Sequence, residues 1–263
     1  MKLWIQLPAQ RGKDKIQFRP YLGILEKVKR PETEISFQAV PPGPGLSSMA
    51  GFGYHGLRFM NDREVLRNAS CAGAKGYDGV VIACYFDPAV RAARQLLPLP
   101  VVGIAEASML LASLMGLRFA VVTSDQRYVE EMAETIHLCG MGARAIAQRP
   151  VRAINLDEKE FLGCLGGDFG PLVEDFTGVA QNCIQDGAQV IIAGCGLMSP
   201  ALTQASLVQL QGVPIIDPIV AGIKVAEMMV ELKRAGFSIV SRTGIFEEVP
   251  SQLQEEARSS GLL

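Results

Sequence analysis

One pattern of residues occurs twice in this chain, and it constrains the fold more than any other feature. The first copy runs from Gly76 through an apolar segment to Cys84, and the second runs from Gly187 through a similar segment to Cys195. In both copies the glycine precedes the cysteine by eight residues, and a helical stretch and a proline-containing apolar run follow. The two cysteines are 111 residues apart. The repeat predicts two similar β-α-β lobes, each with a cysteine at the end of a strand.

Runs of β-branched residues alternate with helical stretches along the whole chain. We expect strands at residues 2–7, 34–40, 79–83, 101–104, 119–123, 190–193 and 214–216, and helices near 18–28, 107–116, 126–139, 172–186, 200–210 and 220–235. Such alternation is typical of α/β proteins, in which helices flank a parallel sheet and the site lies beyond the carboxyl ends of the strands. The prediction is two pseudo-symmetric lobes with a cleft between them. Residues 1–104 plus 217–263 form the lobe with Cys84, and residues 105–216 form the lobe with Cys195.

Composition excludes several classes of function. The chain has 25 basic and 27 acidic residues and no basic cluster, so we expect no nucleic-acid partner. No secretory signal follows Met1, and proline and polar residues interrupt the long uncharged segments. We therefore expect a cytoplasmic protein without a membrane partner. Six cysteines without a CxxC motif and only two histidines give no zinc-ligand spacing, so we expect no metal.

Each repeated cysteine lies between an apolar strand and a marked helix start. Asp87 and Ser199 are good N-cap residues, and Pro88 and Pro200 suit the first helical position. We expect the helix dipole and its free N–H groups to lower each thiol pKa by about one. If the lobes face each other, one thiolate can remove a proton from a carbon while the other thiol protonates the opposite face. This interpretation is inversion of a stereocentre without a cofactor.

A free cysteine is also often a small buried hydrophobe with no chemical role. We apply that interpretation to Cys71, Cys139, Cys164 and Cys183, which do not lie at a strand-to-helix junction. The matched positions of Cys84 and Cys195 favour the catalytic interpretation for these two.

Two further segments are candidates for the site. Residues 45–56, which include Ser47 and Ser48, are expected to form a flexible loop over the mouth of the cleft. This segment contains a GxGxxG match, but no strand directly precedes it, as a dinucleotide site requires. Thr123 and Ser124 end a predicted strand and can donate to a substrate oxygen; turn capping is an equally good interpretation.

Around the cysteines the chain resembles the aspartate/glutamate/hydantoin racemase superfamily, and most of all its hydantoin racemase branch. The resemblance extends over about residues 76–232 and is carried by residues 80–88, 92–94, 100–107, 119–123, 191–195 and 214–217. Amino-acid racemases of the superfamily tend to have Asn-Thr after the first cysteine and Thr-Glu after the second. Here those positions hold Tyr85-Phe86 and Gly196-Leu197, and Asp87-Pro88 follows as in the hydantoin branch.

The resemblance implies two flavodoxin-like lobes, no pyridoxal phosphate and no metal. Carried over by position, Cys84 and Cys195 become the catalytic pair, and neighbouring residues become substrate contacts. The predicted contacts are Gln6, Pro8, Ser47, Ser48, Tyr85, Phe86, Asp87, Thr123, Ser124, Gly196 and Leu197. The first strand departs from the branch, which usually has Asn-Pro-Asn where this chain has Gln6-Leu-Pro8-Ala-Gln.

The leading hypothesis is a cofactor-independent racemase that inverts the acidic carbon of a 5-substituted hydantoin, or of a related small carbonyl compound, with two cysteines. The alternatives are an amino-acid racemase and an enzyme that resembles maleate isomerase or arylmalonate decarboxylase and acts on a small dicarboxylate. A two-lobed binding protein for a small molecule is the alternative outside enzymes. Relatives often self-associate, which leaves a homo-oligomer open.

Overall fold

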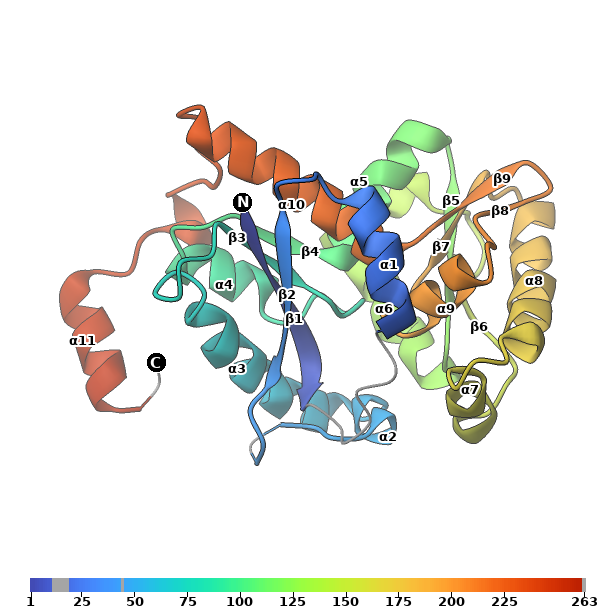
Figure 1. Cartoon of the computed structure of the whole chain (residues 1–263), viewed down its shortest axis with the longest axis horizontal. Coiled ribbons are helices and arrows are strands. Elements are labelled where there is room, and N and C mark those ends of the chain that lie inside the picture. Colours follow the sequence, from blue (N-terminus) through green and yellow to red (C-terminus); the bar gives the residue numbers. More distant parts are fainter. Residues whose placement is uncertain (11–18, 44, 262–263) are drawn as a thin grey trace.

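The strands of the protein form two separate sheets (Figure 1) in the computed structural model, which describes residues 1–10, 19–43 and 45–261. We call the part of the chain around the first sheet lobe 1 and the part around the second lobe 2. Lobe 1 has four parallel strands in the order β2-β1-β3-β4. They are β1 (Lys2–Gln10), β2 (Glu34–Val40), β3 (Gly79–Ile82) and β4 (Val101–Gly103).

Lobe 2 has five strands in the order β6-β5-β7-β9-β8, parallel except for the short edge strand β8, which is antiparallel to β9. They are β5 (Phe119–Thr123), β6 (Val151–Ala153), β7 (Val190–Ala193), β8 (Gln209–Leu210) and β9 (Val213–Ile216). The α/β prediction is therefore confirmed. All strands of the first sheet lie before residue 104, and all strands of the second lie between residues 105 and 216. The division of the whole chain into lobes at residues 104 and 216 stays a prediction.

Alternate residues of the central strands enter different cores. Val81 of β3 packs in a core that also contains Val121 of β5 and Ile192 of β7, so the two sheets share this core. The neighbouring Val80 belongs to a second core behind the sheet of lobe 1, and Val122 belongs to a third behind the sheet of lobe 2. Because apolar side chains cover both faces, these strands are continuous apolar runs, as buried parallel strands usually are.

Helices of both lobes pack on these three cores. Those of lobe 1 are α1 (Arg19–Val28), α2 (Met49–Phe52), α3 (His55–Ser70) and α4 (Val90–Leu96). Those of lobe 2 are α6 (Val129–Leu138), α7 (Glu158–Cys164), α8 (Gly170–Gln185) and α9 (Met198–Gln204), with the 3₁₀ turns η2 (Gln126–Tyr128) and η3 (Gly142–Arg144). Residue 18, the first residue of the helix predicted at 18–28, lies outside the described residues.

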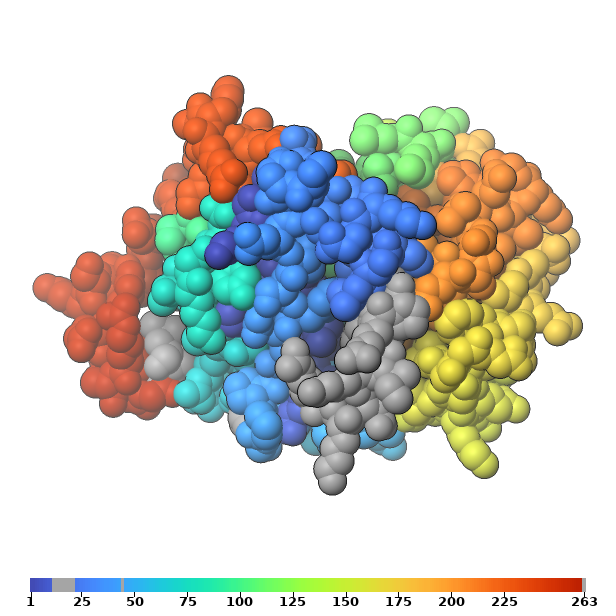
Figure 2. Space-filling model, in the orientation of Figure 1, coloured from blue at the N-terminus to red at the C-terminus, as the bar shows by residue number. Residues whose placement is uncertain are grey.

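Two helices connect the lobes. α5 (Ile104–Met115) follows the last strand of lobe 1 and leads into lobe 2, and α10 (Pro218–Arg234) follows β9 and returns to lobe 1. The two helices pack against each other between the sheets (Figure 1). The chain then passes through η4 (Gly244–Phe246) to α11 (Ser251–Ser259), which stands out from the body of the molecule at the left of Figure 2. None of the helices in the described ranges combines the length and apolar sequence that crossing a membrane requires.

The repeat in the sequence corresponds to a repeated turn. Gly76 and Gly187 have φ angles of 74° and 95°, which L-residues with a side chain rarely adopt. In both turns the residue after the glycine donates its backbone N–H to the carbonyl oxygen five residues earlier, as in a Schellman motif. The glycines thus reverse the chain just before β3 and β7, the two strands that lead to the cysteines. The pseudo-symmetry predicted from the repeat is present in the fold.

Candidate active site

Cys84 lies two residues beyond the end of β3, in a loop whose course differs from the prediction. The thiol residue is only 9% exposed, and the next helix, α4, begins at Val90 and not at Pro88. Asp87 therefore does not cap α4. Its carboxylate accepts hydrogen bonds from the backbone N–H groups of Ala105 and Glu106, at 3.0 and 2.9 Å, and so caps α5.

Cys195 occupies the matching position beyond β7 and is half-buried. Helix α9 begins at Met198, so the prediction that Ser199 is the N-cap is also wrong. Ser199 lies inside the first turn, and its hydroxyl donates to Asp217 Oδ1 at 3.1 Å. Asp217 is the N-cap residue of α10. In each lobe the cysteine loop is thus connected to the start of the helix that crosses to the other lobe.

The two cysteine loops pack against each other. A Cβ atom built on Gly196 would lie 3.0 Å from the carbonyl oxygen of Ala83, and one on Gly194 would lie 3.4 Å from the ring of Tyr85. The residues on both sides of Cys195 therefore contact the residues on both sides of Cys84. The two thiols are also close enough that charge on Cys195 raises the pKa of Cys84. The structure brings the predicted pair together across the junction of the lobes.

The electrostatic environment of Cys84 is the opposite of the one expected. Burial raises the pKa of the Cys84 thiol to about 12, and the nearby charges of Asp62, Asp87 and Cys195 add to that effect. The backbone N–H of Phe86 opposes it by a hydrogen bond to the sulfur. The predicted lowering by a helix N-terminus is wrong for Cys84, because α4 begins six residues later in the chain.

One wall of the site is formed by a cation and two aromatic rings. The Arg58 guanidinium lies 4.0 Å from the centre of the Phe86 ring, and Phe86 meets Tyr128 edge-to-face at 5.3 Å. Burial raises the pKa of the Tyr128 hydroxyl, and charge on Cys195 or Cys84 raises it further, so this residue lies near both thiols. Arg58 is itself buried and donates to the carbonyl oxygen of Phe52 and to Glu131.

The segment predicted to cover the cleft mouth contains α2, which lies beyond the carboxyl end of β1 (Figure 1). Lobe 2 contacts it directly. The Tyr128 hydroxyl donates to the carbonyl oxygen of Met49 at 3.3 Å, and a Cβ on Gly53 would lie 2.7 Å from the Arg127 guanidinium. The two serines predicted as contacts, Ser47 and Ser48, are exposed just before α2.

The predicted contacts on β1 are occupied by internal hydrogen bonds. Gln6 is fully buried, and its side-chain oxygen Oε1 accepts from Trp4 Nε1 and Asn68 Nδ2 at 2.8 and 2.9 Å. The carbonyl oxygen of Pro8 accepts from Asn61 Nδ2 at 2.8 Å. These groups hold α3 against the carboxyl end of β1. The departure from Asn-Pro-Asn in this strand therefore coincides with a structural role for Gln6.

The remaining predicted contacts lie around the two loops. Tyr85 is buried, Phe86 and Asp87 are half-buried, and Gly196 and Leu197 are half-buried between Cys195 and α9. The Thr123 hydroxyl donates to the carbonyl oxygen of Gly194 at 3.3 Å, so it supports the Cys195 loop. The Ser124 hydroxyl oxygen is buried and has no hydrogen-bond partner among the described residues.

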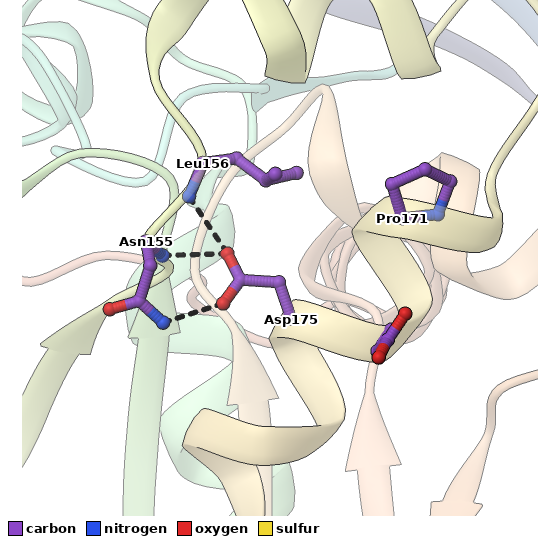
Figure 3. A pocket seen from close by; sticks show the side chains of 5 residues that line it. Asn155, Leu156, Pro171 and Asp175 are labelled. Carbon is purple, nitrogen blue, oxygen red and sulfur yellow. Dashed lines mark hydrogen bonds between the residues drawn. The ribbon is translucent and has the colours of Figure 1, made fainter.

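A separate hollow of about 360 Å³ lies in lobe 2, lined by Asn155, Leu156, Pro171, Glu174 and Asp175 (Figure 3). It is not lined by either cysteine. The Asp175 carboxylate accepts from both nitrogens of Asn155 and from the backbone N–H of Leu156, at 2.6 to 2.8 Å. The Asp175 carboxylate is thus paired within the protein, and the hollow contains neither of the repeated cysteines. The part of the chain that the structure describes contains no group of three or more His, Cys, Asp or Glu side chains fit to hold a metal ion.

Three residues of the site were not predicted from the sequence: Arg58, Asp62 and Tyr128. Tyr128 could have been found, because it follows the end of β5, where a parallel sheet places its site. Arg58 and Asp62 carry no such signal, since charged side chains four residues apart on a helix usually indicate a solvated face.

The protein is therefore a two-lobed α/β protein in which the loops that carry Cys84 and Cys195 contact each other at the junction of the lobes. The family model described as Asp/Glu/Hydantoin racemase matches residues 58–226, and the chain belongs to this family. It is a racemase, which removes the binding-protein alternative, and the resemblance expected from the cysteine segments is confirmed.

Individual relatives agree with this assignment. The chain is 32% identical to a hydantoin racemase from Pseudomonas sp. (strain NS671) over 206 residues, which cover 77% of this chain and 76% of the relative. Its fold is similar to that of an allantoin racemase from Klebsiella pneumoniae, with a TM-score of 0.77, 28% identity and coverage of 95% and 94% of the two chains. An allantoin racemase from Pseudomonas fluorescens gives a TM-score of 0.73 at 25% identity, with coverage of 95% and 97%.

Proposed function

We propose that this protein racemises a 5-substituted hydantoin or a closely related cyclic ureide, with Cys84 and Cys195 as the two acid–base groups and without a cofactor. The observation that carries the proposal is the contact between the two cysteine loops, in which Gly194 and Gly196 lie against Tyr85 and Ala83. This contact favours a small substrate whose reacting carbon lies between the two sulfur atoms. The names of the relatives, hydantoin racemase and allantoin racemase, support this substrate class.

The chemistry requires only proton transfers. One thiolate removes the proton from C5 of the ring and becomes a thiol, while the electron pair passes into the adjacent ring carbonyl. The other thiol then gives its proton to the opposite face of C5 and becomes the thiolate. The product is the mirror-image hydantoin, and the two sulfurs have exchanged protonation states. Hydrogen-bond donors aimed at the carbonyl oxygen stabilise the planar intermediate, and the unpaired Ser124 hydroxyl is a donor available for that purpose.

The surroundings of Cys84 favour a ring over a free carboxylate. Arg58 is a cation next to this thiol, but it already donates to the Phe52 carbonyl oxygen and to Glu131. Asp62 and Asp87 place further negative charge near the same sulfur. An amino acid or a dicarboxylate would bring another negative charge to this position, whereas a hydantoin is neutral. Amino-acid racemisation and dicarboxylate isomerisation or decarboxylation are therefore the weaker alternatives.

The test follows exchange at C5 of a single-enantiomer 5-substituted hydantoin in deuterated water, by ¹H NMR together with optical rotation. We expect Cys84→Ser and Cys195→Ser each to lower the racemisation rate by about 10²–10⁴-fold, the usual contribution of a positioned acid or base. Cys71→Ser is the matched control, because Cys71 is exposed at the end of α3.

Two outcomes would contradict the proposal. Racemisation by either single variant at the rate of the Cys71→Ser protein would exclude the two-thiol scheme. A covalent adduct on one cysteine during turnover of a small dicarboxylate, detected by mass spectrometry of the intact protein, would favour the isomerase alternative instead.

A further inference from the structure

The buried face of α3 carries two charged residues at its amino-terminal end. Arg58, Asp62, Val65 and Ala69 follow one another at spacings of four, three and four residues, so they lie on one face of the helix. Val65 and Ala69 pack in the outer core of lobe 1. The charged pair lies at the end of this face near the carboxyl edge of the sheet, where Cys84 is located.

The position of this helix end is fixed by Asn61. Its side-chain nitrogen donates to the carbonyl oxygen of Pro8, and its oxygen accepts from the backbone N–H of Leu46, both at 2.8 Å. The helix is thus joined both to β1 and to the segment that precedes α2. These two hydrogen bonds of Asn61 also fix the position of the next residue, Asp62.

Asp62 has an oxygen without a partner. Its Oδ1 atom is buried and accepts no hydrogen bond from the residues in the described ranges. Burial raises the pKa of Asp62 to about 6, against the lowering effect of Arg58 and His55 on the same helix. The carboxyl is therefore mostly ionised at neutral pH, as a carboxylate with an unsatisfied oxygen. A buried carboxylate oxygen without a partner costs stability, so its presence calls for an explanation such as a role in the reaction.

The charged end of α3 lies next to the Cys84 loop: Arg58, one helical turn before Asp62, stacks 4.0 Å from the centre of the Phe86 ring, two residues after Cys84. Asp62 interacts electrostatically with Cys84, and Arg58 interacts with both. The other charged or titratable groups around the thiol are Asp87 of its own loop, Cys195 of the facing loop and Tyr128 of η2. Arg58 is shared with Glu131 of α6. Its positive charge is thus divided between two carboxylates and does not neutralise Asp62 alone.

We propose that Asp62 is a positioning residue that keeps the proton on Cys84 in the free enzyme, so that Cys84 enters the reaction as the proton donor. The inference rests on the proposed two-thiol reaction, in which one cysteine must begin protonated and the other must not. Cys195 then removes the substrate proton, and Cys84 gives up its own. Each turnover leaves a thiolate on Cys84 beside the Asp62 carboxylate. This repulsion favours return of a proton to Cys84 before or during the next turnover.

The test measures the reactivity of Cys84 without any substrate. Iodoacetamide alkylates thiolates far faster than thiols, and peptide mass spectrometry reports each cysteine separately. We expect Asp62→Asn to increase the alkylation rate of Cys84 at pH 8 by about tenfold, because removal of one adjacent charge lowers a thiol pKa by about one. Asp62→Glu keeps the charge and should retain the slow rate. Glu64→Gln is the matched control, because Glu64 lies on the same helix and pairs with Arg67.

Cys183 serves as an internal monitor of folding, since it is fully buried in the outer core of lobe 2. If Asp62→Asn exposes Cys183, Asp62→Ser removes the same charge with a smaller side chain. An unchanged or slower alkylation of Cys84 in a folded, neutral variant would overturn the inference. Faster alkylation without racemisation of any hydantoin would leave it standing and would count against the proposed substrate alone.

Discussion

Ser124 and Thr123 are neighbouring hydroxyl residues at the end of β5, and the structure uses them differently. Thr123 is fully buried and donates to the carbonyl oxygen of Gly194, the residue before Cys195. Ser124 is also buried, but its hydroxyl has no partner among the described residues. A buried hydroxyl without a partner costs stability, about 1–3 kcal/mol, and is available to a ligand. One residue thus supports the loop, and the other is free to bind substrate.

This difference gives a prediction at the scale of single residues. Ser124→Ala should leave the free energy of unfolding unchanged or slightly higher, while it lowers kcat/KM for the hydantoin by about tenfold or more, the value of one hydrogen bond to developing charge. Thr123→Val is the matched variant. It leaves the Gly194 carbonyl unpaired and should cost about 1–3 kcal/mol of stability. Urea unfolding and steady-state kinetics on both proteins provide the measurement. Full activity in Ser124→Ala would remove this residue from the substrate contacts.

At the scale of elements, an aspartate caps each of the two helices that cross between the lobes, but the aspartate comes from a different place in each lobe. In lobe 2, Asp217 is the N-cap of α10 and accepts from the backbone N–H groups of its second and third residues, Ile219 and Val220. In lobe 1 the N-cap of α5 is Gly103, which has no side chain, and Asp87 from the cysteine loop reaches the second and third N–H groups instead. A Cβ on Gly103 would lie 2.3 Å from the Asp87 carboxyl carbon, so the two arrangements exclude each other.

The equivalence of the two caps can be tested by placing an aspartate at the N-cap position of α5, as in α10. Asp87→Ser alone should lower the free energy of unfolding by about 1–2 kcal/mol, because α5 loses its cap. Addition of Gly103→Asp should restore much of that loss, since the new carboxylate would occupy the position that Asp217 has in lobe 2. Thermal or urea unfolding of the single and double variants measures the effect. A double variant no more stable than Asp87→Ser would show that the two caps are not equivalent.

The elements also show what could be read from the sequence and what could not. The buried strands were predicted nearly to the residue, as with β5 and β7, because continuous β-branched runs have few other uses. The three-residue strand β6 was missed because it is too short to show a pattern, and the two residues of β8 were wrongly included in the helix predicted at 200–210, which ends at Gln204. Helix α3 was missed for another reason: Leu57, Phe59 and Met60 are exposed, while Arg58 and Asn61 are buried. Its hydrophobic pattern therefore does not mark the side that packs on the protein.

The unusual burial of polar residues on α3 also limits how much of the site could be predicted. The cysteines were found because a repeated spacing places them at strand ends, and that geometry follows from topology alone. Arg58 and Asp62, which contribute to the charge around Cys84, lie on the unpredicted helix α3, and the role of Arg58 depends on contacts with Phe52, Phe86 and Glu131. Asp87 was identified, but the expected cap was assigned to the wrong helix. Asp87 caps α5, which is adjacent in space, whereas the sequence places Asp87 next to α4, the following helix in the chain.

At the scale of the whole molecule, the chain crosses between the lobes twice: α5 leads into lobe 2, and α10 returns to lobe 1. Glu227 of α10 is 1% exposed and accepts from the Arg30 backbone N–H and the Thr33 hydroxyl, both at 2.7 Å, and from Lys224 Nζ at 2.6 Å. The bonds from Arg30 and Thr33 join α10, the helix that returns to lobe 1, to the turn between α1 and β2. Burial alone would raise the pKa of Glu227, but Lys224, Arg30 and Thr33 outweigh it and hold the pKa below its usual value.

This contact predicts how the stability of lobe 1 depends on pH. A carboxyl whose pKa is lower in the folded state stabilises the fold above its unfolded pKa, about 4.3, and loses that contribution as the pH falls through the folded value. Glu227→Gln should therefore lower the free energy of unfolding by about 2 kcal/mol at pH 7, through the loss of charge-assisted hydrogen bonds. The difference from the wild type should shrink below about pH 4. Trp4, the single tryptophan, is fully buried in lobe 1 and reports unfolding in urea by its fluorescence.

Glu231→Gln is the matched control, because its carboxylate pairs with the same Arg30 from a side chain that is 39% exposed. An exposed ion pair contributes about 0.2–1 kcal/mol, so this variant should change stability little at either pH. If Glu227→Gln were destabilised equally at pH 7 and pH 3.5, the loss would come from packing and not from the charge. The return of α10 to lobe 1 would then depend on its apolar face, including Ile223 and Val230 in the core shared by the two sheets. If the loss of stability is confined to neutral pH, the Glu227 carboxylate is the group that holds α10 to the turn between α1 and β2.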